Sequence, residues 1–130
     1  MEKLTIDTFK EKIFDFEKNE TVLKGTIPMI IDFYADWCGP CRAISPILEE
    51  LNKEYEGKVN IYKINVDEEP ILSRHFNIRN IPAVIFMPVD TPDFTLSIGA
   101  KPKSAYIKMI EDLFSISNTK PASFDTISVK

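Results

Sequence analysis

Two short apolar segments, residues 28–34 and 59–66, are separated by a segment of helical periodicity, and this order strongly restricts the folds open to the chain. Both segments are rich in β-branched and aromatic residues, as expected for strands that are buried on both faces. Between them, Ile44, Leu48 and Leu51 recur at helical spacing. A strand, a helix and a second strand in this order favour two parallel strands joined by a helical crossover.

The remaining segments continue this alternation of helices and strands. A first helix is predicted to begin at Thr8, which has capping-box spacing to Glu11, and a short strand at residues 3–6 precedes it. We further predict a surface connection at residues 19–25, helices at 68–76 and 104–114, and strands at 83–87 and 94–98, the last with one solvent-exposed face. The order predicts an α/β fold with a central mixed sheet of four to five strands, flanked by helices on both faces.

Composition and charge exclude several classes of partner. The 130-residue chain is 44% hydrophobic and 28% charged, which is typical of one soluble globular domain. Its net charge of −4 argues against binding to nucleic acid or to an anionic membrane, because both attract basic faces. No apolar run approaches the ~20 residues of a membrane span, and the N-terminus lacks the apolar block of a secretory signal, so we expect a cytoplasmic protein. A periplasmic protein whose leader had been removed would give the same sequence.

Both cysteines of the chain, Cys38 and Cys41, come just after the strand predicted at residues 28–34. In an open α/β sheet, reactive sites belong at this carboxyl end of a strand. As a structural staple the pair would close a very short loop, which contributes only about 2 kcal/mol in the loop-entropy treatment. As a zinc site the pair lacks ligands, because the only histidine, His75, lies in a different predicted helix. A zinc site shared between two chains stays open.

The spacing of the pair favours redox chemistry instead. Two residues separated by one helical turn have Cα atoms about 5 Å apart, which lies inside the range for a disulfide. A helix N-terminus presents free N–H groups and a positive dipole, and both favour a thiolate at Cys38. Gly39 would leave room for a substrate, Pro40 is tolerated in a first turn, and Cys41 should be more shielded than Cys38. We therefore expect Cys38 to attack and Cys41 to resolve.

The segment "WCGPC" at residues 37–41 resembles the redox-active motif of the thioredoxin family. Pro46 lies where that family has a kink-forming proline in its second helix. The resemblance includes three further segments: "KINVD" at residues 63–67, "IRNIPAV" at 78–84 and "IGA" at 98–100. Because these segments occur in the family's order and spacing, the resemblance is specific.

The resemblance extends over residues 4–114 and implies a thioredoxin fold. It divides the chain into a thioredoxin domain at residues 1–114 and a C-terminal extension of unknown role at residues 115–130, which the family core lacks. The loop at residues 88–93 departs from the family pattern, because it is longer and contains two prolines. Its conformation therefore stays open.

Asp32 stands in an otherwise apolar predicted strand. From the residues alone, two interpretations are equally good: an acid that hydrogen-bonds the following turn, and a proton-transfer group. The resemblance implies the second. Asp32 would then exchange a proton with Cys41, through water, and Lys63 would lie beside Asp32.

From frequency alone the Ile81–Pro82 bond should be trans, because only about 5–6% of X–Pro bonds in folded proteins are cis. The resemblance instead implies a cis bond that faces the disulfide, where the Ile81 backbone would pair with an extended substrate. It also implies a flat apolar surface that binds client proteins, formed by Trp37, Gly39, Pro40, Ile81, Pro82, Gly99 and Ala100.

Together these inferences predict a thiol–disulfide oxidoreductase that reduces protein disulfides by dithiol–disulfide exchange through Cys38 and Cys41. The Gly-Pro dipeptide favours reduction, since oxidants and isomerases of the superfamily usually carry a histidine there, and thioredoxin lies about 150 mV below the strongest oxidant. The resemblance implies disulfide-containing clients and a thioredoxin reductase as electron donor. We expect a monomer with no bound cofactor or metal. The chain lacks the glycine-rich motif of proteins that bind a dinucleotide cofactor. Two alternatives stay open: a disulfide oxidant or isomerase of an oxidising compartment, and a non-catalytic binding module on the same fold.

Overall fold

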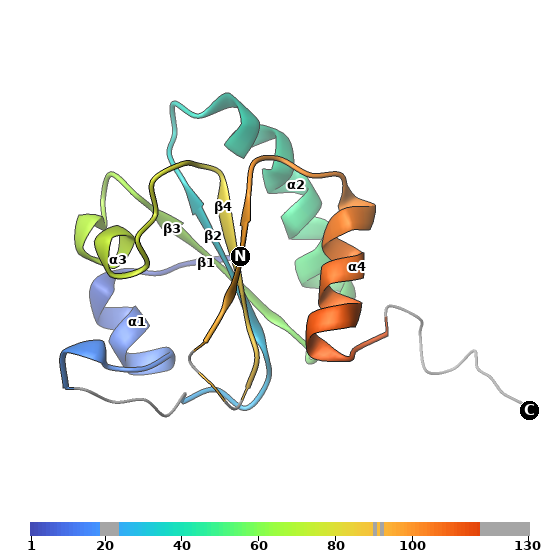
Figure 1. The fold of residues 1–130 in the computed structure, drawn as a ribbon, viewed down its shortest axis with the longest axis horizontal. Helices are drawn as coiled ribbons and strands as arrows, with labels where there is room; N and C mark the ends of the chain where they lie inside the picture. The colour runs from blue at the N-terminus through green and yellow to red at the C-terminus, as the bar shows by residue number, and fades with distance from the viewer. Residues whose placement is uncertain (19–23, 90, 92, 118–130) are drawn as a thin grey trace, which may run out of the picture.

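A central five-stranded sheet organises the part of the chain that the computed structural model describes, residues 1–18, 24–89, 91 and 93–117 (Figure 1). Its strands lie in the order β1-β3-β2-β4-β5. They are β1 (Glu2–Lys3), β2 (Met29–Tyr34), β3 (Asn60–Asn65), β4 (Ala83–Met87) and β5 (Thr95–Ile98). Strands β1, β3 and β2 run parallel, whereas β4 pairs antiparallel with both β2 and β5. The predicted mixed sheet is confirmed.

Helices cover both faces of this sheet (Figure 1). Helices α1 (Ile6–Lys12) and α3 (Pro70–His75) pack on one face, together with the short 3-10 helix η1 (Phe16–Lys18). Helices α2 (Gly39–Glu54) and α4 (Lys103–Phe114) pack on the other face. The predicted α/β fold is therefore confirmed. Pro46 lies inside α2, which continues through it.

The central strand β2 shows why two separate apolar cores form. Successive side chains of a strand point to opposite faces. Ile31 and Phe33 therefore enter the core beneath α1 and α3, while Ile30 enters the core beneath α2 and α4, and all three are fully buried. Asp32 lies two positions after Ile30 on the same face. The fold thus places a carboxyl group in an otherwise apolar layer.

Helix α1 begins earlier than predicted, and its cap corrects the sequence interpretation. The N-cap is Thr5, whose hydroxyl accepts a hydrogen bond from the Thr8 N–H at 3.2 Å. The Thr8 hydroxyl in turn accepts one from the Thr5 N–H at 2.8 Å. Thr8 thus takes the place that Glu or Gln usually has in a capping box, so its spacing to Glu11 does not mark the helix start. The leading strand is likewise at β1 and not at residues 3–6.

The edge strand β5 is a strand as predicted, but only Ser97 in it is buried and its apolar side chains are exposed. Leu96 and Ile98 are 38% and 46% exposed, whereas Ser97 between them is buried. Ser97 pairs with Val84, which belongs to the core beneath α2 and α4, and Leu96 pairs with Ile85 on the opposite face. Because α3 on that face spans only 6 residues, it leaves the outer strand partly uncovered.

Some predictions fall on residues that the structure does not describe. These are most of the predicted connection at residues 19–25, two positions of the loop at 88–93 and the extension beyond residue 117. The division into a domain at residues 1–114 and an extension at 115–130 therefore stays a prediction. Among the helices of the described ranges, none is long and apolar enough to cross a membrane.

Candidate active site

The two cysteines lie where the central strand β2 leads into helix α2 (Figure 1). Cys38 is the N-cap of α2, and Cys41 lies in its first turn. They form a disulfide with Cα atoms 5.3 Å apart, in agreement with the distance expected from their spacing. The pair thus occupies the carboxyl end of a central strand, where open α/β sheets place their reactive groups.

The start of helix α2 directs positive partial charge at the Cys38 sulfur. The Cys41 N–H donates a hydrogen bond to Cys38 Sγ, with nitrogen and sulfur 3.2 Å apart. Pro40 fits within this first turn because its nitrogen has no hydrogen to satisfy. A thiolate at the same sulfur would gain from both the hydrogen bond and the helix dipole. The geometry therefore favours negative charge at Cys38.

Cys38 is as covered as Cys41, which contradicts the expectation of a more open outer sulfur. The two residues are 4% and 3% exposed. Their disulfide packs in a small cluster with Ala35, Val66 and Ile81, so both sulfurs share the same cover. A substrate sulfur therefore meets a disulfide of which only a small part is exposed.

The residues beside Cys38 form an exposed rim around the covered disulfide. Trp37 is 68% exposed, and Gly39 and Pro40 are exposed as well. A Cβ atom on Gly39 would meet only the Arg42 guanidinium, at 3.9 Å, and its φ angle is not positive. Since neither crowding nor backbone conformation requires a glycine there, the open space beside Cys38 is available to a bound chain.

Trp37 is held by a residue that the sequence interpretation did not select. Its indole Nε1 donates a hydrogen bond to Asp67 Oδ2 at 2.8 Å. Asp67 follows β3, and its own N–H donates to the side-chain oxygen of Asn65 at 2.9 Å. The resemblance included the segment that ends at Asp67 but not this contact. This hydrogen bond therefore fixes the position of an exposed indole beside the disulfide.

The loop before β4 also reaches the disulfide. Its Ile81–Pro82 peptide bond is cis. The family resemblance implied this cis bond, whereas the low frequency of cis X–Pro bonds predicted a trans bond. Ile81 packs against the disulfide cluster, and the Pro82 carbonyl accepts a hydrogen bond from the Gly99 N–H at 2.9 Å. Gly99 has a φ of +89°, a conformation that favours glycine. The fold thus brings Ile81 to the disulfide and Gly99 beside Pro82, with Ala100 exposed next to Gly99.

Asp32 pairs in register with Lys63 of the neighbouring strand β3. It is 2% exposed, and its Oδ1 has no hydrogen-bond partner among the described residues. Burial raises the pKa of the Asp32 carboxyl group to about 7, while the Lys63 ammonium acts to lower it. Lys63 Nζ also lies 5.6 Å from the centre of the Tyr34 ring, within range of a cation–π contact. A carboxyl group with this pKa can accept or release a proton near neutral pH.

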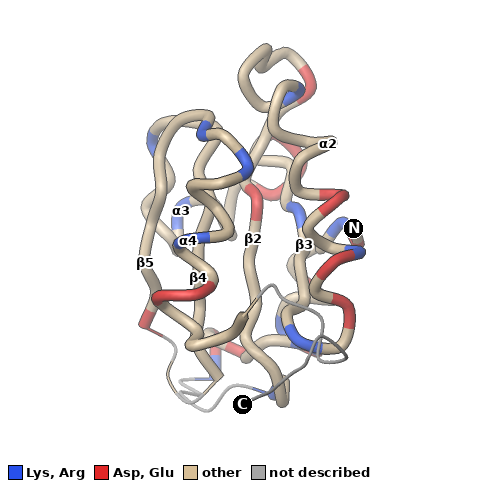
Figure 2. Tube along the Cα trace, turned by 90° about the vertical axis from the view of Figure 1, so that its right-hand side faces the viewer, with Lys and Arg blue, Asp and Glu red and all other residues tan. Residues whose placement is uncertain are grey.

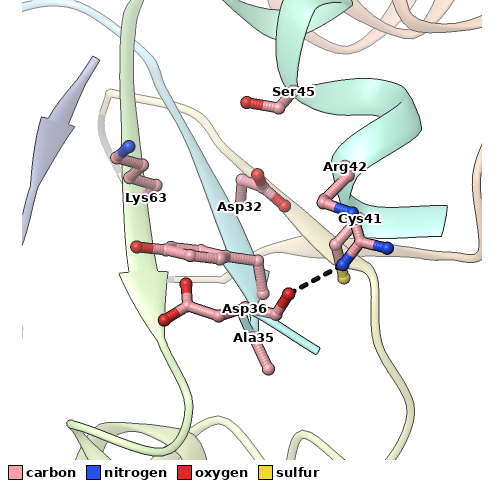
Figure 3. Close-up of a pocket in the computed structure, with 8 residues that line it drawn as sticks. Asp32, Ala35, Asp36, Cys41, Arg42, Ser45 and Lys63 are labelled. Atoms are coloured by element: carbon pink, nitrogen blue, oxygen red, sulfur yellow. Dashed lines mark hydrogen bonds between the residues drawn. The ribbon is translucent and has the colours of Figure 1, made fainter. Parts of the chain in front are cut away.

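Asp32 and Cys41 share one cavity of about 150 Å³ (Figure 3). Its lining comes from β2, β3, α2 and the turn after β2, and consists of Asp32, Tyr34, Ala35, Asp36, Cys41, Arg42, Ser45 and Lys63. Arg42 Nη1 donates a hydrogen bond to the Asp36 carbonyl oxygen at 2.8 Å, the dashed line in Figure 3. The cavity thus connects the inner sulfur with the buried carboxyl group.

Five lining residues were not selected from the sequence: Tyr34, Ala35, Asp36, Arg42 and Ser45. Two of them follow a selected residue by one structural repeat. Tyr34 comes two residues after Asp32 on a strand, and Ser45 comes four residues after Cys41 on a helix. Each therefore shares a face of its strand or helix with a candidate residue. This spacing is the sequence signal that could have identified both residues.

In the view of Figure 2, basic and acidic residues are interspersed along the chain and are not gathered by sign.

Within the described ranges, no group of three or more His, Cys, Asp or Glu residues is placed to hold a metal ion. His75, the only histidine of the chain, lies in α3 with its ring stacked on Phe16, the centroids being 4.2 Å apart. Its ring is used in packing.

Known proteins share this sequence pattern and this fold. The sequence matches the thioredoxin family over residues 5–112. It is 39% identical over 112 residues to a thioredoxin of Borreliella burgdorferi, covering 85% of this chain and 95% of that protein. It is 42% identical over 105 residues to a chloroplastic M-type thioredoxin of Spinacia oleracea, covering 81% of this chain and 58% of that protein. A crystal structure of chloroplastic thioredoxin z matches with a TM-score of 0.72 at 27% identity, over 87% of this chain and 93% of that one.

Proposed function

The chain belongs to the thioredoxin family and is a thiol–disulfide oxidoreductase that reduces protein disulfides, and we propose that Cys38 is its attacking sulfur and Cys41 its resolving sulfur. The hydrogen bond from the Cys41 N–H to Cys38 Sγ, at the start of α2, supports this division most directly. In the reduced protein the same donor would face a Cys38 thiolate, which is the nucleophilic form. Cys41 lines the cavity that contains Asp32, so its proton has a defined destination. Nothing in the site favours an oxidant, an isomerase or a non-catalytic binding module.

The exchange proceeds through a mixed disulfide. The Cys38 thiolate attacks one sulfur of the client disulfide, forms a new S–S bond to it and releases the other client sulfur as a thiolate. Deprotonated Cys41 then attacks Cys38 Sγ, forms the Cys38–Cys41 disulfide and releases the first client sulfur. The client gains two electrons and two protons, and the enzyme dithiol loses both.

Asp32 is assigned as the acceptor of the Cys41 proton, through water, with Lys63 influencing its charge. The assignment draws on the shared cavity and on the raised pKa of Asp32, about 7, which leaves part of the carboxyl group ionised at neutral pH. Asp32→Asn should slow resolution of the mixed disulfide by about 100-fold and its formation much less, because only resolution needs this acceptor. Rapid mixing with a Cys38-linked substrate separates the two steps, and equal slowing of both would contradict the role.

The proposed client-binding surface combines the rim of α2 with the two loops that reach the disulfide. It consists of Trp37, Gly39, Pro40, Ile81, Pro82, Gly99 and Ala100. The anchored indole of Trp37 and the open space at Gly39 support this assignment. An extended client segment would pair with the Ile81 backbone as an added strand. Because main-chain bonds and apolar contacts are tolerant of sequence, such a surface suits many clients.

Partners and compartment follow from family membership. Electrons would come from a thioredoxin reductase, which would bind the nicotinamide and the flavin, so this chain would work without a bound cofactor. We place the protein in the cytoplasm, as a monomer, with the periplasm as the alternative compartment. Its relatives include bacterial and chloroplastic thioredoxins.

Reduction of insulin disulfides, driven by NADPH and thioredoxin reductase, tests these assignments. Cys38→Ser should abolish turnover, because the nucleophile is lost, whereas Cys41→Ser should accumulate a mixed disulfide between Cys38 and the client. Ser104→Ala, at an exposed position of α4, should reduce insulin at the wild-type rate. Trapping of the client on Cys41 in the Cys38→Ser variant would overturn the division of roles between the two sulfurs.

A further inference from the structure

The cavity between β2, β3 and α2 contains a hydroxyl group that the exchange steps above do not use. Ser45 lines this cavity together with Asp32 and Cys41 (Figure 3). It lies one helical turn beyond Cys41, so both side chains project from the same face of α2. In Figure 3 the Ser45 oxygen points into the space between α2 and β3, on the side where Asp32 and Lys63 lie.

The cavity contains polar groups without protein partners. Asp32 Oδ1 is buried without a hydrogen-bond partner in the described part of the chain, and the Ser45 hydroxyl has none there either. Buried polar atoms in proteins almost always have a partner, and water takes this place where a cavity is polar and large enough. The volume of about 150 Å³ exceeds the ~10–15 Å³ that one water requires. The cavity can therefore hold several waters between the two oxygens.

We propose that Ser45 is a positioning residue for the resolving step, its hydroxyl orienting the water through which Cys41 passes its proton to Asp32. This inference rests on the proposed roles of Cys41 and Asp32. A hydroxyl suits the place because it both donates and accepts hydrogen bonds, so it can order a water whichever way the proton moves. The neighbouring cations cannot order the water in this way, because Arg42 already donates to a backbone carbonyl and Lys63 has hydrogen-bond donors only.

The resolving step balances with the groups that are present. The Cys41 S–H bond breaks, and its proton moves through the oriented water to the Asp32 carboxylate. The Cys41 thiolate supplies the electron pair for the new bond to Cys38, and the client sulfur leaves with the pair of the bond that breaks. The client thiolate takes a proton from solvent, and Asp32 later returns its own proton to solvent. Ser45 orders the path and has no net change.

Charged and titratable groups lie on each element packed around Asp32. They are Tyr34 on β2, Lys63 on β3, Asp36 in the turn after β2, Cys41 and Arg42 on α2, and Tyr106 on α4. All of them remain in a Ser45→Ala variant. Loss of the hydroxyl weakens the hydrogen bonding of the ionised carboxylate through water, so the pKa of Asp32 should rise further. The pH midpoint of the resolving step should rise with it.

Rates of mixed-disulfide formation and resolution, measured by rapid mixing on both sides of neutral pH, test this role. Ser45→Ala should slow resolution about fivefold, as expected for one lost hydrogen bond, and raise its pH midpoint, without changing formation. Ser45→Thr keeps the hydroxyl and should restore the wild-type rate and midpoint. Because alanine has the higher helix propensity, Ser45→Ala should not lower the melting temperature, which excludes a folding defect. Ser104→Ala is the matched control and should change none of these quantities.

The Asp32→Asn background distinguishes this inference from the function on which it rests. If Ser45 acts through Asp32, adding Ser45→Ala to Asp32→Asn should slow resolution no further. Wild-type resolution and an unshifted pH profile in Ser45→Ala, beside slow resolution in Asp32→Asn, would overturn the role of Ser45 alone. Wild-type resolution in Asp32→Asn would overturn the proposed role of Asp32 and the role of Ser45 with it.

Discussion

Asp32 and Phe33 are adjacent on β2 and equally buried, but they face opposite environments. Phe33 belongs to the apolar core beneath α1 and α3, where its ring centroid lies 5.6 Å from that of Phe76. Asp32 faces the cavity beside Cys41 and has an oxygen without a partner among the described residues. At this end of β2 one side is dry and closely packed, and the other borders a polar, hollow space.

This difference separates what stabilises the fold from what performs the exchange. Burial of apolar surface stabilises by roughly 25 cal/mol per Å², whereas burial of a carboxyl group without a partner destabilises its charged form. A side chain on the dry side contributes stability and has no proton to transfer. Asp32, beside the hollow space, lowers stability when it is ionised and gains a pKa that is useful at neutral pH.

Phe33→Ala should have the largest effect on stability, lowering the free energy of unfolding by about 3–5 kcal/mol, because it leaves a void in the dry core. Urea unfolding of the oxidised protein measures this change. The pH midpoint of the resolving step should stay at the wild-type value, since Phe33 points away from Asp32. A shifted midpoint would show that the two sides of β2 are not independent.

Asp32→Asn should act in the opposite direction and raise the free energy of unfolding at alkaline pH. Burial raises the pKa of Asp32 from 3.8 to about 7, so between these values the folded protein keeps a proton that the unfolded chain has released. Wild-type stability should therefore fall as pH rises through this range, by about 4 kcal/mol at most. The variant should lack this fall.

Urea unfolding of the oxidised proteins across this pH range measures the effect of Asp32, because the cysteines are held in the disulfide and do not titrate. Wild type and variant should differ little at acidic pH, where Asp32 is protonated in both the folded and the unfolded state. The variant should be the more stable protein at mildly alkaline pH. The same pH dependence in both proteins would contradict a raised pKa.

Thr5→Ala should have the smallest effect, a loss of about 1 kcal/mol in the free energy of unfolding. Thr5 caps α1, and this helix covers the dry side of the sheet through Phe9. Thermal unfolding measures the loss, and Thr5→Ser, which keeps the hydroxyl, should restore most of it. Insulin reduction should be unchanged in both variants. Slower reduction at unchanged substrate affinity would mean that the dry side also affects the exchange chemistry.

Most elements of the fold could be predicted because their signals are local. The continuous apolar run at residues 28–34 predicted β2, and the periodic run after the cysteines predicted α2. The start of α1 was predicted wrongly, because Thr5 and Thr8 cap each other and no local rule ranks that pair above Thr8 with Glu11. The exposure of Leu96 and Ile98 could not be predicted, because it depends on how far α3 reaches across the sheet.

Much less of the candidate site was accessible from the residues themselves. The Cys38 and Cys41 spacing predicted the disulfide distance, but the cover over Cys38 comes from Val66 and Ile81, which are distant in the chain. The cis bond at Pro82 required a family resemblance, because a lone X–Pro pair favours trans.

The sequence by itself determined the order of helices and strands, the pairing distance of the two cysteines and the helix start that attracts negative charge to Cys38. These depend on hydrogen bonds and side-chain periodicities within a few residues. Only the tertiary structure decided how closely the disulfide is covered and that Asp32, Ser45 and Cys41 line one cavity. The physical reason is that burial, and the pKa shift that follows from it, arise where side chains of different elements pack together.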